Sequence, residues 1–170
     1  VNDAPVLATI LDVYFNEDES GLLTLLASDV DGDDLLYTIS NGFEINTSLD
    51  NNIVLLTSPE NYNGSESFTV SVSDGDLSDS QSFTVTVNAV NDAPVATTDL
   101  SGVTNEDQSV VISLSASDVD GDNLTFSLDI DALNGSIEIN GTFVTYIPNQ
   151  DFNGDDSFTF EVSDGELTDT

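Results

Sequence analysis

The stretch NGSESFTVSVSDG, residues 63–75, sets the fold class of this chain. Phe68, Val70 and Val72 alternate with Thr69 and Ser71. Alternation of β-branched or aromatic residues with small polar ones is typical of a strand that buries one face and hydrates the other. The stretch occurs again as NGDDSFTFEVSDG, residues 153–165, so the chain contains the same unit twice.

Three further motifs recur 89 positions apart: VNDAPV, NED and ASDVDGD, which begin at Val1, Asn16 and Ala27. The two copies of the opening stretch are 90 apart, so the second copy has gained one residue in its middle. A period near 90 is too long for a solenoid repeat and suits an independent domain. The sequence therefore predicts two tandem domains, residues 1–89 and 90–170.

Short alternating segments separated by turn residues fill both copies, and no helical period of useful length is present. About seven short strands in 90 residues predict an all-β fold, an antiparallel Greek-key sandwich of immunoglobulin type in each copy. Besides the strands around 68–72, 83–87 and 158–162, the predicted strands are 22–27, 35–39, 43–49, 53–57, 110–116, 124–128, 136–139 and 143–147.

The second copy stops at Thr170, which corresponds to Ser80, and so lacks the counterpart of Gln81–Val87, the last strand of the first copy. An open sheet edge at that place would be prone to aggregation. We expect either the continuing chain or a strand exchanged from another molecule to cover it.

The composition restricts the partners of this chain. Asp and Glu total 33 and Lys, Arg and His are absent, for a net charge of −33, while 38% of residues are hydrophobic, enough to form cores. A surface without one basic residue should bind neither nucleic acid nor an anionic membrane surface. The absence of Cys excludes disulfides and thiol chemistry, and the absence of His removes the commonest zinc ligand.

The acidic loop SDVDGD, at residues 28–33 and 117–122, places three carboxylates on alternate residues around one glycine. Like charges this close disfavour ionisation unless a cation lies between them, and the chain supplies none. Oxygen donors alone favour Ca²⁺. The glycine position does not fit an EF-hand. Two alternatives remain open, an ordinary turn and a halophile's hydrated surface, although the acid is concentrated at this loop, VSDG and the linker rather than spread evenly.

Together these motifs resemble the cadherin-type repeat, in particular the cadherin-like tandem repeats of large bacterial adhesins. The matching features are a Glu after the first strand, an Asp-x-Asp before an L-x-Y-x-I strand, an Asp in a late S-D-G and an Asn-Asp-x-Pro linker. The residues that carry the match are Glu17, Glu106, Asp29, Asp31, Asp118, Asp120, Asn123, Asp74, Asp164, Asn2, Asp3, Asn91 and Asp92.

The resemblance implies that Ca²⁺ binds where two repeats meet. By this resemblance the ligands of the junction are Glu17, Asn91, Asp92, Asp118, Asp120, Asn123 and Asp164. A second, weaker or empty set is implied at the start of the first domain: Asp3, Asp29, Asp31 and Asp74. The acidic pair that cadherins carry before a late Tyr has no clear match. Asp33, Asp34 and Asp122 either bind or face water, and Asn63 and Asn153 are candidates to replace that pair.

We expect no enzyme, because only carboxylate pairs are available for catalysis and nothing places such a pair in a pocket. The predicted function is a calcium-rigidified stalk segment of a secreted adhesin or fibre on a bacterial cell surface, with neighbouring repeats as partners. Two alternatives are a filament joined by strand donation between molecules and a carbohydrate-binding module. For the latter, the aromatic candidates outside the alternating strands are Phe43, Tyr62 and Phe152.

Overall fold

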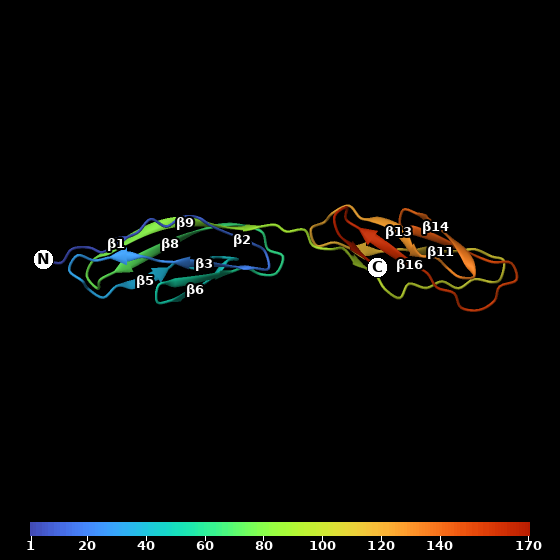
Figure 1. The fold of residues 1–170 in the computed structure, drawn as a ribbon, viewed down its shortest axis with the longest axis horizontal. Helices are drawn as coiled ribbons and strands as arrows, with labels where there is room; N and C mark the ends of the chain where they lie inside the picture. Colours follow the sequence, from blue (N-terminus) through green and yellow to red (C-terminus); the bar gives the residue numbers. More distant parts are fainter. The chain divides into compact units, whose positions relative to one another are not determined.

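The computed structural model describes residues 1–170, which divide into two compact units, Val1–Val90 (unit 1) and Asn91–Thr170 (unit 2). Both units are built from strands and turns (Figure 1). The structure contains no helix that could cross a membrane. The all-β fold class is confirmed.

Unit 1 is a sandwich of two sheets with a short strand pair beside them. One sheet has the order β2-β9-β8-β5 and the other β3-β7-β6, while β1 pairs with β4 (Figure 1). All pairings are antiparallel except β2 with β9, which is parallel. The strands are β1 (Val6–Leu7), β2 (Val13–Asn16), β3 (Ser20–Thr24), β4 (Ala27–Ser28), β5 (Leu36–Ile39), β6 (Asn46–Asp50), β7 (Ile53–Thr57), β8 (Gly64–Ser73) and β9 (Ser78–Asn88).

Alternate residues of both sheets of unit 1 point inward and form one core, as the period of two predicts. Phe68, Val70 and Val72 of β8 are buried, and so are Phe83, Val85 and Val87 of β9. Six more hydrophobic residues complete the buried cluster: Leu7, Phe15, Leu25, Ile45, Val54 and Leu56. The strand β9 therefore contributes a quarter of the twelve buried hydrophobic side chains.

Unit 2 repeats this plan with three strands in each sheet, ordered β11-β15-β14 and β13-β16-β17, and a β10-β12 pair. Only four hydrophobic residues are buried in it: Ala96, Leu114, Val144 and Val162. Its strands are β10 (Val95–Ala96), β11 (Val110–Ser113), β12 (Ala116–Ser117), β13 (Thr125–Ile130), β14 (Gly135–Asn140), β15 (Phe143–Pro148), β16 (Thr159–Ser163) and β17 (Thr168–Asp169). The strand β17 has two residues, and β9 of unit 1 has eleven.

Three predicted strands are wrong in detail. The segments 22–27 and 110–116 are not continuous, because the chain changes partner within them: β3 pairs with β7 but β4 pairs with β1. The segment 43–49 becomes a strand only at Asn46. Its first three backbone N–H groups instead donate to the carboxylate of Glu66, at 2.8, 2.7 and 3.2 Å, and this geometry belongs to a loop.

Candidate metal centre

The acidic loop brings its three carboxylates together in both units. Oxygens of Asp118, Asp120 and Asp122 all lie within 4.8 Å of one another, and those of Asp29, Asp31 and Asp33 do the same. Asp29 organises the turn, since its Oδ1 accepts the backbone N–H groups of Asp31, Gly32 and Asp33 at 2.9, 3.0 and 3.3 Å. The spacing on alternate residues thus becomes one cluster of carboxylate oxygens in each unit.

The glycine of the loop is required by its backbone conformation. Gly121 and Gly32 both have φ of 80°, in the left-handed region that residues with a Cβ rarely adopt. A Cβ at either glycine would meet no atom within 4 Å, so the constraint comes from the backbone and not from space. This reversal lets the third carboxylate turn back toward the first.

The VNDAP motif is fixed against the loop of its own unit. In unit 2 the N–H of Asp92 donates to Asp120 Oδ2 at 2.9 Å, and in unit 1 the N–H of Asp3 donates to Asp31 Oδ2 at 2.8 Å. The motif's proline is fully buried in both units, at Pro5 and Pro94. The motif therefore approaches the loop in the same way in each unit.

The aspartate of VSDG joins the same arrangement. Asp164 Oδ1 accepts the N–H groups of Glu166 at 2.6 Å and Leu167 at 2.7 Å, while Oδ2 accepts the side-chain amide of Asn91 at 2.9 Å. These bonds, with the Leu167 N–H foremost, then that of Glu166 and then Asn91, hold the pKa of Asp164 below its ordinary value. Asp74 in unit 1 has the equivalent partners, and its pKa is lowered in the same way.

Charge crowding is visible in the loop of unit 1. The pKa of Asp33 is raised, first by loss of hydration and then by the neighbouring carboxylates of Asp29 and Asp31, with smaller effects from Asp74 and Asp34. Four acidic neighbours disfavour the charged form of one exposed side chain. A bound cation would reverse this effect.

Three carboxylate oxygens in these regions are buried and accept no hydrogen bond: Asp29 Oδ2, Asp118 Oδ2 and Glu17 Oε2. Glu17 is the most enclosed, because its side chain is only 4% exposed. Its other oxygen, Oε1, accepts the N–H of Val90 at 2.6 Å, and its own N–H donates to the carbonyl of Asn88 at 2.9 Å. A buried carboxylate oxygen without a donor is costly unless a cation binds it.

The donor chemistry fits a hard cation such as Ca²⁺, because carboxylate and amide oxygens are the only ligands offered. Unit 2 brings together five of the six residues that the sequence predicted there. The five, linked as described above, are Asn91, Asp92, Asp118, Asp120 and Asp164. The exception is Asn123, which is exposed and forms no hydrogen bond to this group. Unit 1 groups Asp3, Asp29, Asp31 and Asp74 in the same manner.

The structure adds two residues to the predicted sets, Asp33 and Asp122, whose carboxylate oxygens lie in the same clusters as those of the other loop aspartates. In the sequence, the position of these two aspartates on alternate residues of DVDGD indicates that they belong to the group. Glu106, the counterpart of Glu17, is exposed instead of buried. Identical motifs therefore have different surroundings in the two units.

The three aromatic residues considered for sugar stacking do not form a platform. Phe43 is 92% exposed, but Tyr62 packs partly buried against the core of unit 1 and Phe152 is partly buried in unit 2. Sugar-binding surfaces that stack on aromatic rings need those rings exposed. Of the three candidates, Phe43 alone is exposed.

A family model described as bacterial Ig domain matches residues 2–88 and again residues 91–170. No curated protein sequence matches the chain. Among solved structures, two crystal forms of human protocadherin-24 EC1-2 are similar in fold. One has a TM-score of 0.64 and 21% identity, with 98% of this chain and 90% of that chain covered. The other has a TM-score of 0.58 and 20% identity, with 95% and 87% covered.

An endo-fucoidan hydrolase of glycoside hydrolase family 107 also aligns, with a TM-score of 0.43 and 23% identity over 98% of this chain. The chain spans 27% of the length of that hydrolase. The family-model match and the fold of the two protocadherin structures confirm the resemblance to bacterial cadherin-like and immunoglobulin-like repeats at the level of family and fold.

Proposed function

Because this chain belongs to the bacterial Ig domain family and carries two consecutive copies of the domain, we propose that it is a calcium-rigidified stalk segment of a secreted bacterial surface protein. Its role is mechanical and non-catalytic, and its partners are the neighbouring repeats of the same chain or fibre. The proposed location is the bacterial cell surface, where millimolar Ca²⁺ matches the affinity of extracellular calcium modules, on the order of 10⁻⁴ to 10⁻³ M.

The observation that carries the proposal is the buried carboxylate of Glu17, whose Oε2 has no hydrogen-bond donor. Its Oε1 is bonded to the N–H of Val90, the residue that directly precedes Asn91 and Asp92 in the sequence. We propose that Ca²⁺ is held by Glu17, by the linker residues Asn91 and Asp92 and by the acidic side chains of unit 2. The proposed ligands in unit 2 are Asp118, Asp120, Asp122, Asn123 and Asp164.

Bound calcium would supply the positive charge that the carboxylates lack. Relief of their mutual repulsion provides the binding free energy, and an ion held by groups of both units restricts motion of the linker. The equivalent group of unit 1, formed by Asp3, Asp29, Asp31 and Asp74, is the second proposed calcium site.

Thermal unfolding in Ca²⁺ and in excess chelator tests the proposal, with Mg²⁺ and NaCl matched in ionic strength. At 100 times Kd, binding stabilises by about 2.7 kcal/mol, which raises Tm by roughly 10 to 20 °C for a domain of this size. A merely hydrated acidic surface would respond equally to all three salts. An equal response would therefore refute specific calcium binding.

Asp120→Ala and its control Glu138→Gln separate binding from charge, because each removes one negative charge from unit 2 and Glu138 is exposed on β14 outside the loop. We expect Asp120→Ala to abolish the calcium-dependent change in the radius of gyration measured by X-ray scattering, and Glu138→Gln to preserve it. Both variants should keep the far-ultraviolet spectrum of folded β-sheet. A radius of gyration that Ca²⁺ leaves unchanged in the unmodified chain would contradict the mechanical role.

A further inference from the structure

The outer face of the sheet β3-β7-β6 in unit 1 is apolar at its centre. Leu22 of β3 lies directly opposite Leu55 of β7, and Ile53 lies on the same face two residues before Leu55. All three side chains are exposed, and Leu22 is 70% exposed. Leu26, also exposed, follows two residues after the end of β3. Adjacent aliphatic side chains of this kind form a patch on the order of a few hundred Å², a size that marks interaction surfaces.

The second sheet of unit 1 shows that the sandwich does not require an apolar outer face. Every outward residue of β8 and β9, over 65–73 and 78–86, is Ser or Thr. Two cross-strand pairs bond through their hydroxyls, Ser65 with Thr86 at 2.9 Å and Thr69 with Ser82 at 3.0 Å. Water satisfies such a surface, whereas exposed Leu and Ile are unfavourably hydrated. The aliphatic face therefore suits a partner better than solvent.

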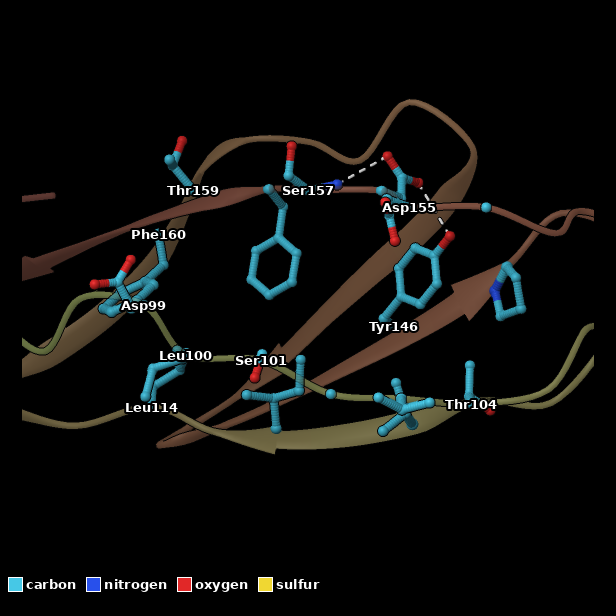
Figure 2. A pocket seen from close by; sticks show the side chains of 18 of the residues that line it. Asp99, Leu100, Ser101, Thr104, Leu114, Tyr146, Asp155, Ser157, Thr159 and Phe160 are labelled. Atoms are coloured by element: carbon cyan, nitrogen blue, oxygen red, sulfur yellow. Dashed lines mark hydrogen bonds between the residues drawn. The ribbon is translucent and has the colours of Figure 1, made fainter.

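The corresponding face of unit 2, on β11-β15-β14, is apolar as well. Tyr146 of β15 lines the pocket of this unit, and its hydroxyl donates to Asp156 Oδ2 at 3.0 Å (Figure 2). Because successive residues of a strand point to opposite faces, Phe143 and Ile147 point outward from the same strand. Both are exposed, and so is Val111 on the neighbouring β11. The two units thus share an apolar outer face although its residues differ.

Each apolar face carries a carboxylate on its third strand. Asp50 of β6 lies opposite Ile53, and Glu138 of β14 lies opposite Thr145. Both acidic residues are exposed, and the chain has no Lys, Arg or His to offset their charge. A second copy of the chain would bring a net charge of −33 against −33. A partner with basic residues beside an apolar stripe matches both the aliphatic centre and the negative charge.

We propose that the outer face of β3-β7-β6, and likewise that of β11-β15-β14, docks a basic amphipathic helix. The apolar stripe of the helix, at positions i, i+3, i+4 and i+7, covers Leu22, Ile53 and Leu55 in unit 1. Lys or Arg side chains beside that stripe lie next to Asp50. This docking needs no calcium, so it adds a partner to the stalk segment proposed above and does not depend on its metal sites.

The test is calorimetric titration of the full chain, in chelator, with a synthetic Leu/Lys peptide of about 18 residues, or five helical turns. The peptide carries Leu at the spacing given above. A second peptide of the same composition distributes its Leu residues so that no apolar stripe forms. Both are measured in about 1 M NaCl, where the Debye length is roughly 3 Å. At that salt concentration the general attraction of Lys to an acidic chain is screened, and the apolar contact remains.

The variants remove the patch of unit 1 alone. Leu22→Thr combined with Leu55→Thr keeps residues that favour strands, and should reduce the stoichiometry from two peptides per chain to one. Leu36→Thr is the control, because Leu36 is 69% exposed on β5 in the other sheet. It should leave the stoichiometry at two. Methyl shifts in the nuclear magnetic resonance spectrum of the unmodified chain locate the peptide without any variant, and should centre on Leu22, Ile53 and Leu55 in unit 1.

Four results would overturn the proposal. The first is equal affinity of the two peptides, and the second is the absence of binding in 1 M NaCl. The third is an equal effect of the Leu36→Thr control and the double variant, or methyl shifts centred on Leu36. The fourth comes from sedimentation of the chain alone: self-association that the double variant abolishes would assign the face to contact between copies of the chain.

Discussion

The side-chain amide of Asn91 donates a 2.9 Å hydrogen bond to Oδ2 of Asp164, 73 residues further along the chain. Asn2 and Asp74 form the same pair in unit 1, at 3.0 Å. Each bond joins the linker motif to the VSDG turn and aligns an aspartate whose other oxygen is already occupied by the turn. Recognition of Asp164 by Asn91 is thus part of the fold of unit 2 before any ion is considered.

Replacement of this amide should destabilise unit 2. Because the Asn91 bond is partly buried and reaches a charged acceptor, Asn91→Ala should lower the free energy of unfolding by about 1 to 2 kcal/mol in chelator. Asn2→Ala, whose bond is exposed, is the matched control and should cost less than about 1 kcal/mol. Urea unfolding of both variants measures this, and equal costs would contradict the dependence on burial.

The glycine of the acidic loop should tolerate only residues that accept a left-handed backbone. Gly121→Ala should destabilise unit 2 by about 1 to 2 kcal/mol, because φ is 80° there. Gly121→Asn should cost less, since Asn enters this region more readily. Denaturant unfolding in chelator distinguishes the two. If Gly121→Ala and Gly121→Asn lowered the free energy of unfolding equally, the left-handed backbone would not be the reason for the loss.

Glu66 should make unit 1 sensitive to acid. Burial raises the pKa of Glu66, but the N–H groups of Glu44, Phe43 and Ile45 outweigh burial, so the pKa lies below its ordinary value of 4.5. A carboxylate with a lowered pKa stabilises the fold above pH 4.5. That stabilisation is lost as the pH falls through the folded-state pKa. At pH 7 the free energy of unfolding of the unmodified unit 1 should therefore be about 1 to 3 kcal/mol higher than that of the Glu66→Gln variant.

The Glu66 prediction is tested as a difference between the two proteins. Protonation of the many other carboxylates changes both equally, so the difference isolates Glu66. It should shrink progressively below pH 4.5 in urea unfolding experiments. A difference that is constant from pH 7 to pH 3 would show that the charge of Glu66 does not hold the loop.

Equivalent phenylalanines should contribute unequally to the two units. Phe68 is 1% exposed and packs against the ring of Phe83 at 5.9 Å, so Phe68→Ala should cost about 3 to 5 kcal/mol. Phe158 is only partly buried, and Phe158→Ala should cost less than Phe68→Ala. Chemical unfolding followed by residue-resolved hydrogen exchange assigns each loss to its unit. Equal costs would mean that Phe158 is packed as closely in solution as Phe68.

The repeat and the strand period were readable from the sequence because both are local. Alternation at Phe68, Val70 and Val72 fixes which face is buried, and recurrence of the motifs fixes the number of copies. The acidic loop was equally readable, since its carboxylates lie on alternate residues. Asp33 and Asp122 were left open only because a spacing does not say which way an exposed side chain turns.

The wrong strand boundaries arose where distant residues competed with local pattern. Residues 43–45 look like a strand, but Glu66, 21 to 23 positions away, captures their backbone N–H groups. The break near Leu25 has a similar cause, because its N–H bonds to the carbonyl of Asn52 at 2.8 Å while the chain passes to another partner. Long-range hydrogen bonds of this kind have no signature in the neighbouring residues.

The sequence by itself determined the sandwich class, the duplication and the excess of oxygen donors, since these depend on composition and short-range order. Only the tertiary structure decided that Glu17 is buried with one oxygen lacking a donor while Glu106 is exposed. The two residues occupy identical NED motifs. Glu17 lies beside the end of β9, where its N–H donates to the carbonyl of Asn88 and its Oε1 accepts the N–H of Val90. Burial is a property of such neighbours, which only folding supplies.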